Sequence, residues 1–361
     1  MKEILFVASH RIDRAPGQRF RFEQYFQYLE KNGFKCTLSN IVSADDDQYL
    51  YKPGELFRKA EFVRKSHSIR RKNIRELGKY DIIFIFREAL MSRSIRYEKQ
   101  FKASGKPIVF DFDDSIWLSN VSDANKWFSW MKNAEKTASI VALSDVAIAG
   151  NQYLADFAKK YNQSVIIIPT TIDTEDYKPL PKIYENNSVT IGWSGSITTI
   201  QHFEYAVPFL KKIKEKYGDS VQIGVIGDGN YNNPEIGVQG IPWSHSTEIK
   251  DLSEFDIGIM PLPDDEWAKG KCGLKGLQYM ALEIPTIMSP VGVNTEIIQD
   301  GENGFLANSE NEWFEKICLL IENSELRQKL GKAGRQTVIE RYSVESQKER
   351  YLKLFNDLLR S

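Results

Sequence analysis

The chain has 361 residues, of which 42% are hydrophobic and 27% charged, and these proportions are typical of a globular protein with two or three domains. No apolar run approaches the roughly 18 residues that a membrane helix needs, and the apolar start from Ile4 to Ala8 is too short for a signal peptide. Cys36, Cys272 and Cys318 show no CxxC spacing, so we expect no disulfide framework and no zinc site, and a cytoplasmic location.

The net charge of −1 conceals an uneven distribution along the chain. Residues 1–170 contain 28 Lys and Arg against 20 Asp and Glu, a net charge of +8, whereas the remaining residues contain 20 against 29, a net charge of −9. Within the basic half, residues 52–80 hold ten basic residues and three glutamates. The two halves are therefore expected to face different partners.

In the first half, short apolar runs alternate with longer helical patterns. The expected strands are Ile4–Ala8, Phe34–Leu38, Asp81–Phe86, Pro107–Phe112, Val146–Gly150 and Val165–Ile168. Their apolar character is continuous, as expected for parallel strands that are buried on both faces. Helical stretches such as Phe20–Lys31 and Lys126–Thr137 lie between them. This half is predicted to be a doubly wound α/β domain.

The same pattern restarts in the second half, after a proline-containing stretch. The expected strands are Val189–Trp193, Val221–Ile226, Ile257–Met260 and Thr286–Met288, with helices near 201–216, 272–283 and 310–323. The last residues read as two helices, with Ser343 as the N-cap of the second. We therefore predict one domain over 1–170, completed by a C-terminal helix over 344–361, a linker over 171–187 and a second domain over 188–343. A ligand cleft is expected at the carboxyl ends of both sheets.

The most informative motif is a helix entry in the second half. A glycine pair, Gly270 and Gly273, precedes the helix, and Lys271 and Lys275 flank its first turn. Free backbone N–H groups and positive charge therefore converge where a diphosphate can bind. Lys271, Lys275 and Gln278 follow i, i+4, i+7 spacing and share one helix face. The alternative is an ordinary solvent-exposed face behind a glycine loop.

This stretch resembles the family 4 retaining glycosyltransferases of the GT-B architecture. Their helix-entry block is matched in order and spacing by Cys272-Gly273-Leu274, Met280-Ala281 and Ile284-Pro285-Thr286-Ile287. Further stretches similar to the family are Ala149–Leu154, Ile168–Asp173, Gly192–Ser196, Gly227–Gly229 and Asp300–Phe305. The resemblance covers nearly the whole chain and is stronger after residue 145. A subset of bacterial surface-polysaccharide transferases looks most similar.

The resemblance implies two facing Rossmann-like domains, with the acceptor bound by the first and a nucleoside diphosphate sugar by the second. It implies transfer of a hexosyl group, with retention, to a hydroxyl of a glycan or lipid-linked glycan in bacterial cell-surface polysaccharide synthesis. No cofactor, metal or nucleic acid is expected, and the location is cytoplasmic or peripheral at the inner face of the cell membrane. The alternatives are a non-catalytic nucleotide-sugar-binding subunit and another GT-B enzyme such as a sugar-nucleotide epimerase.

The sequence departs from the family at its donor site. The family's two glutamates, which contact the donor sugar and the ribose, are replaced by Gly270 and Gln278, and the loop Ser194–Thr199 lacks the usual Arg and Lys. Gln278 can still bond ribose hydroxyls, and Lys271 and Lys275 can supply the missing charge. The donor-binding candidates are Gly195, Ser196, Lys271, Gly273, Leu274, Lys275 and Gln278.

In the first domain, Asp113 and Asp114 follow an expected buried strand and are the catalytic candidates, which would bond acceptor hydroxyls or orient the nucleophile. The alternative is that they cap the next segment. Gly17, Arg19 and Arg21, in the first βα loop, are the acceptor-side candidates; otherwise they are helix-entry residues.

A basic helix is expected between residues 53 and 78. Its apolar positions are Leu56, Ala60, Val63, Ile74 and Leu77, and its basic residues include Arg58, Lys59, Arg64, Lys65, Arg71, Lys72 and Arg75. We expect it to bind an anionic membrane surface, although His67 and Arg70 interrupt the apolar stripe. The alternative is a solvated run of charge.

Overall fold

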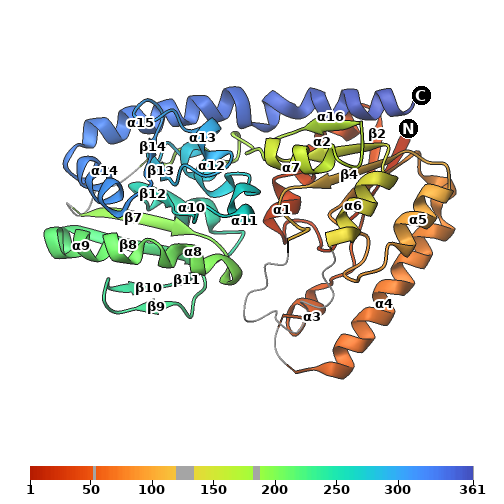
Figure 1. Ribbon diagram of the computed structural model, residues 1–361, viewed down its shortest axis with the longest axis horizontal. Coiled ribbons are helices and arrows are strands. Elements are labelled where there is room, and N and C mark those ends of the chain that lie inside the picture. Colours follow the sequence, from red (N-terminus) through yellow and green to blue (C-terminus); the bar gives the residue numbers. More distant parts are fainter. Residues whose placement is uncertain (52–53, 119–133, 182–187, 361) are drawn as a thin grey trace. The chain divides into compact units, whose positions relative to one another are not determined.

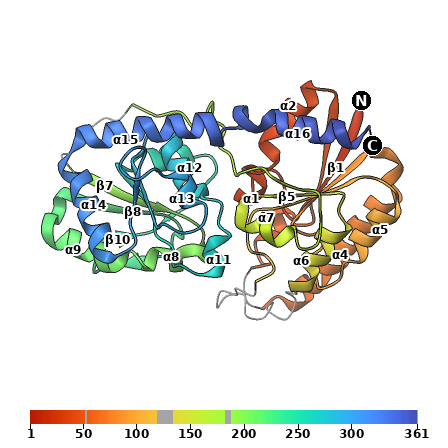
Figure 2. The ribbon, with the colours of Figure 1, turned by 45° about the horizontal axis from the view of Figure 1, so that its top comes forward.

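The computed structural model describes residues 1–51, 54–118, 134–181 and 188–360, and the chain divides into two compact units (Figure 1). The first comprises Met1–Thr170 and Gln347–Ser361, and the second Thr171–Ser346. Each unit has one parallel six-stranded sheet with helices on both faces (Figures 1 and 2). Among the described residues, no helix combines the length and the apolarity needed to cross a membrane.

The sheet of the first unit has the strand order β2-β1-β3-β4-β5-β6. Its strands are β1 (Lys2–Val7), β2 (Phe34–Ser39), β3 (Ile82–Phe86), β4 (Ile108–Phe112), β5 (Val146–Ala149) and β6 (Val165–Ile167). The helices of this unit are α1 (Pro16–Arg19), α2 (Phe26–Lys31), α3 (Ala44–Asp47), α4 (Leu56–Arg75), α5 (Arg96–Ala103), α6 (Ala134–Leu143), α7 (Gln152–Ala158) and most of α16 (Val344–Leu358). All six strands expected from the sequence are present.

One expected helix of this unit differs from the structure, and a second lies mostly outside the described residues. The first was predicted over Phe20–Lys31, but α2 begins only at Phe26. Phe20, Arg21 and Phe22 are all buried, and three consecutive side chains do not point to one side of a regular helix. The second, predicted over Lys126–Thr137, falls mostly outside the described residues, and α6 begins at Ala134.

The sheet of the second unit has the strand order β11-β8-β7-β12-β13-β14. Its strands are β7 (Val189–Ser194), β8 (Val221–Gly227), β11 (Ile241–Pro242), β12 (Ile257–Met260), β13 (Thr286–Met288) and β14 (Phe305–Leu306), with a separate hairpin of β9 (Asn232–Asn233) and β10 (Val238–Gln239). The helices are α8 (Ile200–Glu204), α9 (Val207–Tyr217), α10 (Glu248–Ser253), α11 (Glu266–Lys269), α12 (Leu274–Ala281), α13 (Asn294–Ile297), α14 (Glu310–Glu322) and α15 (Ser324–Thr337).

Aromatic rings pack directly on the backbone of this sheet. An added Cβ at Gly192 in β7 would lie 1.9 Å from the ring of Phe255, and one at Gly258 in β12 would lie 2.4 Å from the ring of Tyr279. Only glycine allows this close approach. Tyr279 belongs to α12, so this contact holds the predicted donor-binding helix against the centre of the sheet.

The segment from residue 171 to 181, which the sequence suggested to be part of a linker, is in the second unit. The N–H of Ile172 donates to the carbonyl of Tyr342 at 2.8 Å, and the guanidinium of Arg335 donates to the carbonyls of Thr174 and Tyr177. These hydrogen bonds connect the backbone of the segment to the end of the second unit, so it packs as part of that unit.

The strand orders identify where each sheet reverses its winding. In a doubly wound sheet, ligands bind at the carboxyl ends of the two strands that flank this point. In the first unit these strands are β1 and β3, and in the second they are β7 and β12. Binding residues are therefore expected in the loops that follow these four strands.

Candidate functional site

In the second unit, the loop after β7 is anchored to helix α12. The phenol of Tyr279 accepts a hydrogen bond from the N–H of Ser194 at 2.7 Å and lies 2.9 Å from the Ser194 hydroxyl. Burial raises the pKa of this phenol, so it stays neutral. An added Cβ at Gly195 would lie 2.2 Å from the Trp193 ring, so the loop backbone lies directly on the indole.

Lys275 lies beside this loop because its ammonium group and the loop backbone both lie against the indole of Trp193. Its ammonium nitrogen is 5.3 Å from the centroid of the Trp193 ring, and that of Lys271 is 4.9 Å from the ring of Trp267. A cation at this distance from an indole is held by its ring quadrupole. The structure thus brings Lys275 and Gly195, which are 80 positions apart in the sequence, to one indole.

Gly273 forms the entry to α12. Its φ of 71° lies in the left-handed region, and an added Cβ would lie 2.3 Å from Ile297, so both conformation and space require glycine. Gly273 is the N-cap residue, and it has no side chain with which to cap this end of the helix. The amino terminus of α12, with Leu274 in its first turn, therefore offers partial positive charge close to the two lysines.

Gln278, expected at the donor ribose, is buried in a network of side chains within the unit. Its amide nitrogen donates to the phenol of Tyr177 at 3.1 Å and to Glu248 at 3.3 Å. Glu248 also accepts from the Tyr177 phenol at 2.6 Å and from the indole of Trp243 at 2.8 Å. Sequence analysis did not reveal this network, because its members come from separate segments and the partners of Gln278 belong to no recognisable motif.

In the first unit, Asp113, Arg87 and Gly17 meet at the carboxyl ends of β3 and β4. Two nitrogens of the Arg87 guanidinium lie 2.8 and 2.7 Å from one oxygen of Asp113. The other carboxylate oxygen of Asp113 would lie 2.8 Å from a Cβ added at Gly17. Asp114 accepts a hydrogen bond from the N–H of Ser115 and lies 4.0 Å from Arg87. Two catalytic candidates and one acceptor-side candidate are thus neighbours.

Arg21, also expected on the acceptor side, lies inside the protein. Its side chain is fully buried; two of its nitrogens pair with the two oxygens of Asp111, and a third donates to the carbonyl of Ile168. These contacts join the segment that follows α1 to strand β4 and to the residue that follows β6, so Arg21 has a structural role inside the first unit. Arg19 is partly exposed, and its guanidinium lies 4.8 Å from the ring of Phe20.

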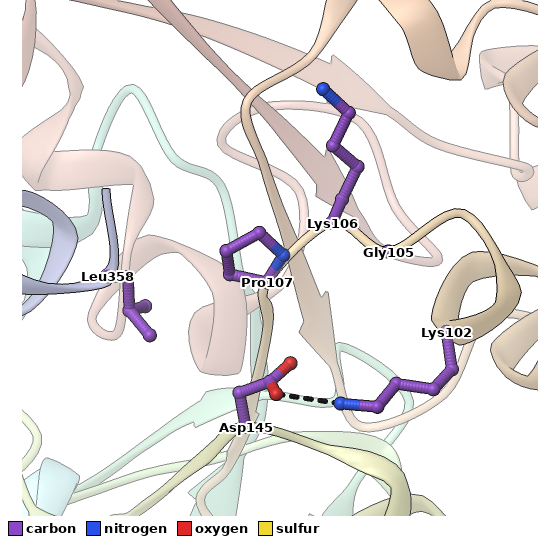
Figure 3. A pocket seen from close by; sticks show the side chains of 6 residues that line it. All are labelled: Lys102, Gly105, Lys106, Pro107, Asp145 and Leu358. Carbon is purple, nitrogen blue, oxygen red and sulfur yellow. Dashed lines mark hydrogen bonds and ion pairs between the residues drawn. The ribbon is translucent and has the colours of Figure 1, made fainter. Parts of the chain in front are cut away.

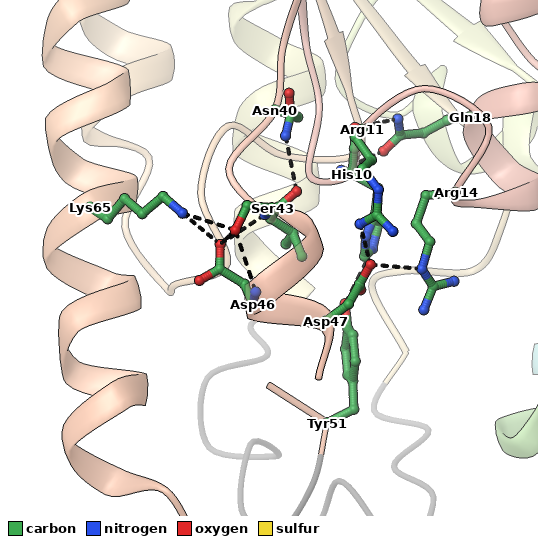
Figure 4. Close-up of polar contacts among 11 residues, drawn as sticks. His10, Arg11, Arg14, Gln18, Asn40, Ser43, Asp46, Asp47, Tyr51 and Lys65 are labelled. Atoms are coloured by element: carbon green, nitrogen blue, oxygen red, sulfur yellow. Dashed lines mark hydrogen bonds and ion pairs between the residues drawn. The ribbon is translucent and has the colours of Figure 1, made fainter. Parts of the chain in front are cut away.

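A polar cluster that the sequence did not indicate lies at the carboxyl end of β1 (Figure 4). Asp47 accepts hydrogen bonds from Arg11 and Arg14, and the Nε2 atom of His10 lies 3.2 Å from the Tyr51 hydroxyl. Burial, the largest cause, lowers the pKa of His10 to about 4, and the neighbouring arginines act in the same direction. The cluster therefore presents a neutral imidazole at neutral pH, beside a carboxylate whose Oδ2 atom accepts from both arginines and whose buried Oδ1 atom has no hydrogen-bond partner among the described residues.

A separate pocket lies at the opposite, amino-terminal edge of the same sheet (Figure 3). It is lined by Lys102, Gly105, Lys106, Pro107, Asp145 and Leu358. Lys102 and Asp145 form an ion pair there at 2.7 Å. Ligands of doubly wound sheets bind at the carboxyl edge, so this pocket is not part of the candidate site. In the described part of the chain, no three His, Cys, Asp or Glu side chains are grouped to hold a metal ion.

Comparison with known families identifies the class of the second unit. Residues 188–323 match the family model described as glycosyl transferases group 1. These residues contain the loop after β7 and the entry to α12. The match to this family therefore lies within the second unit and includes the candidate donor-binding residues.

Curated relatives extend the similarity beyond this family match. The trehalose synthases of Thermococcus litoralis and Pyrococcus furiosus are each 33% identical over 267 aligned positions, which cover 60% of this chain and 62% of theirs. A poly(ribitol-phosphate) alpha-N-acetylglucosaminyltransferase of Staphylococcus aureus is 32% identical over 87 positions, covering 23% of this chain and 18% of the enzyme. The chain thus spans less than two thirds of the length of these relatives.

Solved structures share the architecture of both units. Sucrose-phosphate synthase from Thermosynechococcus elongatus matches with a TM-score of 0.72 at 13% identity, over 99% of both chains. Anabaena Alr3699/HepE in complex with UDP-glucose matches with a TM-score of 0.68 at 13% identity, over 99% of this chain and 100% of that one. The chain therefore has the GT-B fold of two Rossmann-like α/β domains, which confirms the predicted fold class.

Proposed function

We propose that the chain is a retaining glycosyltransferase of family 4 that moves a hexosyl group from a nucleoside diphosphate sugar to a hydroxyl of a glycan or lipid-linked glycan. The observation that carries this proposal is the arrangement of Lys271 and Lys275 around the uncapped entry of α12, inside the residues that match the group 1 family. Positive charge and free backbone N–H groups together suit a diphosphate. The complex of Anabaena Alr3699/HepE with UDP-glucose supports a uridine nucleotide as the first donor to try.

In this proposal the second unit stabilises the departing diphosphate. The two ammonium groups and the helix dipole offset the negative charge that develops as the glycosidic bond breaks, and such preorganised charge is a major source of catalysis. Lys275 is held beside the Gly195–Ser196 loop by Trp193, so little reorganisation is needed. No divalent metal is required in this scheme, and turnover should persist in EDTA; loss of turnover that manganese restores would contradict it.

The first unit would bind the acceptor. Asp113 is the carboxylate proposed to bond an acceptor hydroxyl, and its pairing with Arg87 keeps it oriented. The backbone of Gly17 approaches this carboxylate closely, because a Cβ there would lie 2.8 Å from its oxygen. Glycans and lipid-linked glycans are the proposed acceptors, and glucose and fructose 6-phosphate belong in the panel because of the similarity to trehalose and sucrose-phosphate synthases.

A role in cell-surface polysaccharide synthesis would require contact with a membrane, and helix α4 offers a surface for it. Near its amino end, Leu56, Phe57 and Val63 are exposed by 65%, 94% and 52%. Further along the helix, Arg71, Lys72 and Arg75 are among the basic residues that are exposed. We call these six residues the docking face. Exposed apolar side chains beside basic residues suit an anionic lipid surface.

Release of nucleoside diphosphate tests the proposal. The purified chain is incubated with UDP-, GDP- and ADP-sugars and the acceptor panel, and the anomeric configuration of the product is read by NMR. A retained α linkage from an α-linked donor is the expected result. Binding of a nucleoside diphosphate sugar without turnover on any acceptor would favour a non-catalytic binding subunit, and conversion of the sugar nucleotide alone would favour an epimerase.

A further inference from the structure

His202 is a buried histidine with an unused ring nitrogen. It lies in α8, which begins directly after the loop that follows β7, and is only 4% exposed. Among the described residues, no hydrogen-bond partner is present for its Nδ1 atom. A buried polar atom without a partner costs about 1–3 kcal/mol. Such an atom beside a binding loop points to a missing ligand.

Packing places α8 next to the lysine site. Phe203, the residue after His202, packs on Trp193 with ring centroids 5.7 Å apart. The same indole carries Lys275 at 5.3 Å and lies beneath Gly195. Helix α8, the Gly195–Ser196 loop and Lys275 are therefore joined through one aromatic side chain.

The charges around His202 come from this site. Besides burial, which is the largest cause, Lys275 and then Lys271 lower the pKa of the imidazole, to about 4, whereas Asp265 acts in the opposite direction. The ring is therefore neutral at pH 7, and one of its nitrogens carries a hydrogen. Two neighbouring cations attract an anionic ligand, and a neutral Nδ1–H group can donate to it without adding a third charge.

We propose that His202 is a third side chain of the donor site, whose Nδ1–H donates a hydrogen bond to a phosphate oxygen of the bound nucleoside diphosphate. This inference rests on the proposed function, because it adds a ligand to the same diphosphate site. His202 acts beside Lys271 and Lys275, and it supplies a neutral donor in a domain whose loop after β7 has no cation of its own. Its contribution should therefore depend on the phosphates and be independent of the base.

The test compares two substitutions of His202 by calorimetry with UDP and with uridine. His202→Phe keeps a ring of similar size and removes the nitrogen, and His202→Asn places an amide nitrogen near the position of Nδ1. We expect His202→Phe to weaken UDP binding by roughly tenfold and to leave uridine binding unchanged, with most of the affinity restored in His202→Asn. His245→Phe, at an exposed histidine of the same unit, is the matched control and should bind UDP as the wild type does.

Nitrogen NMR gives a second readout that a purely structural histidine would not move. The Nδ1 resonance of His202 should shift on addition of UDP and not on addition of uridine. The inference would be overturned by unchanged UDP affinity in His202→Phe, or by an equal loss of affinity for UDP and uridine. The donor site itself is tested separately, by the UDP affinity of Lys271→Ala. If the wild type binds none of UDP, GDP and ADP, the proposed function fails, and the inference fails with it.

Discussion

Lys275 and Gly195 contact the same indole, that of Trp193, although they belong to a helix and a loop far apart in the sequence. The contact fixes the ammonium group beside a loop that contains no cation. A lysine on a free four-carbon stem would lose side-chain entropy on binding a ligand. Here part of that cost is already met in the folded protein, because the ring holds the cation in place.

Alanine at either lysine should weaken binding of nucleoside diphosphate. Each of Lys271→Ala and Lys275→Ala removes a charged hydrogen-bond donor, and we expect a loss of about 1.5–3 kcal/mol, or roughly ten- to a hundredfold in affinity. Calorimetry with UDP measures the effect, and Lys250→Ala, at an exposed lysine of the same unit, is the control. Wild-type affinity in both variants would rule out this diphosphate site.

The stability of the protein should depend on pH through His202. Its pKa is about 4 in the folded state, mainly because of burial, against about 6.5 in the unfolded chain. Between these values the unfolded state binds more protons, so this contribution to stability is present above pH 6.5 and is lost as the pH falls toward 4. Through this group, the free energy of unfolding should fall by about 2 kcal/mol between pH 7 and pH 5.

Urea unfolding of the wild type and His202→Phe at both pH values measures this contribution. The variant lacks the titrating group, so the difference in unfolding free energy between the two proteins should change by about 2 kcal/mol between pH 7 and pH 5. Other titrating groups act equally in both proteins and cancel in this comparison. A difference that is the same at both pH values would show that His202 is readily protonated in the folded protein.

Removal of one partner from the Arg21–Asp111 pair should strongly destabilise the first unit. Both side chains are fully buried, and Asp111→Ala leaves the guanidinium without its carboxylate, which costs about 3–5 kcal/mol. Replacing both residues together, with Arg21→Met and Asp111→Leu, should restore much of the loss. Lys2→Ala, at the exposed pair of Lys2 with Asp81, should change stability by less than about 1 kcal/mol. A small effect of Asp111→Ala in urea unfolding would contradict the structural role of the pair.

Sedimentation with liposomes tests the docking face of α4. Binding should require anionic lipid, weaken with salt, and fall by roughly a hundredfold when Arg71, Lys72 and Arg75 are all changed to Glu. Phe57→Ser should weaken it independently. Glutamate at Lys31, Lys35 and Lys160, exposed elsewhere on this unit, is the charge-matched control. Equal binding to neutral vesicles, or none to anionic ones, would exclude this surface.

Arg70 does not belong in that test, although it lies on the same basic helix and the sequence analysis identifies it only as an interruption of the apolar stripe. Its side chain is fully buried and donates to the carbonyls of Ala8, Ser39 and Ala89. Burial lowers its pKa to about 10, so it remains charged at neutral pH. A glutamate at this position would unfold the region around α4, and a loss of lipid binding would then have no clear meaning.

The strands could be predicted from the sequence because their signal is local. Continuous apolar runs such as Ile82–Phe86 occur in few other contexts, and the helix entry at Gly273 carries its own glycine and lysine pattern. The sequence signal for an N-cap at Ser343 is also local. The structure confirms this cap, because the Ser343 hydroxyl accepts a hydrogen bond from the N–H of Ser346 at 3.0 Å.

Buried polar partners could not be predicted, because each depends on residues distant in the sequence. Arg21 and Arg70 resemble any solvent-exposed arginine until strands β4 and β2 are placed beside them. Gln278 was expected to face a ribose, but its amide nitrogen meets Tyr177, which is 101 positions away. A single sequence contains no record of such pairings, whereas the resemblance to a family marked only the loops around the site.

The hydrogen bonds of Tyr177 determine where a fragment that contains only the second unit can begin. The family match begins at residue 188, but the phenol of Tyr177 binds Glu248 and its carbonyl accepts from Arg335. A fragment that starts at 188 would lose both contacts and open a buried polar network to water. Ligand screens and crystallisation of the second domain alone should therefore use a fragment that begins at Thr171, where the packed unit itself begins.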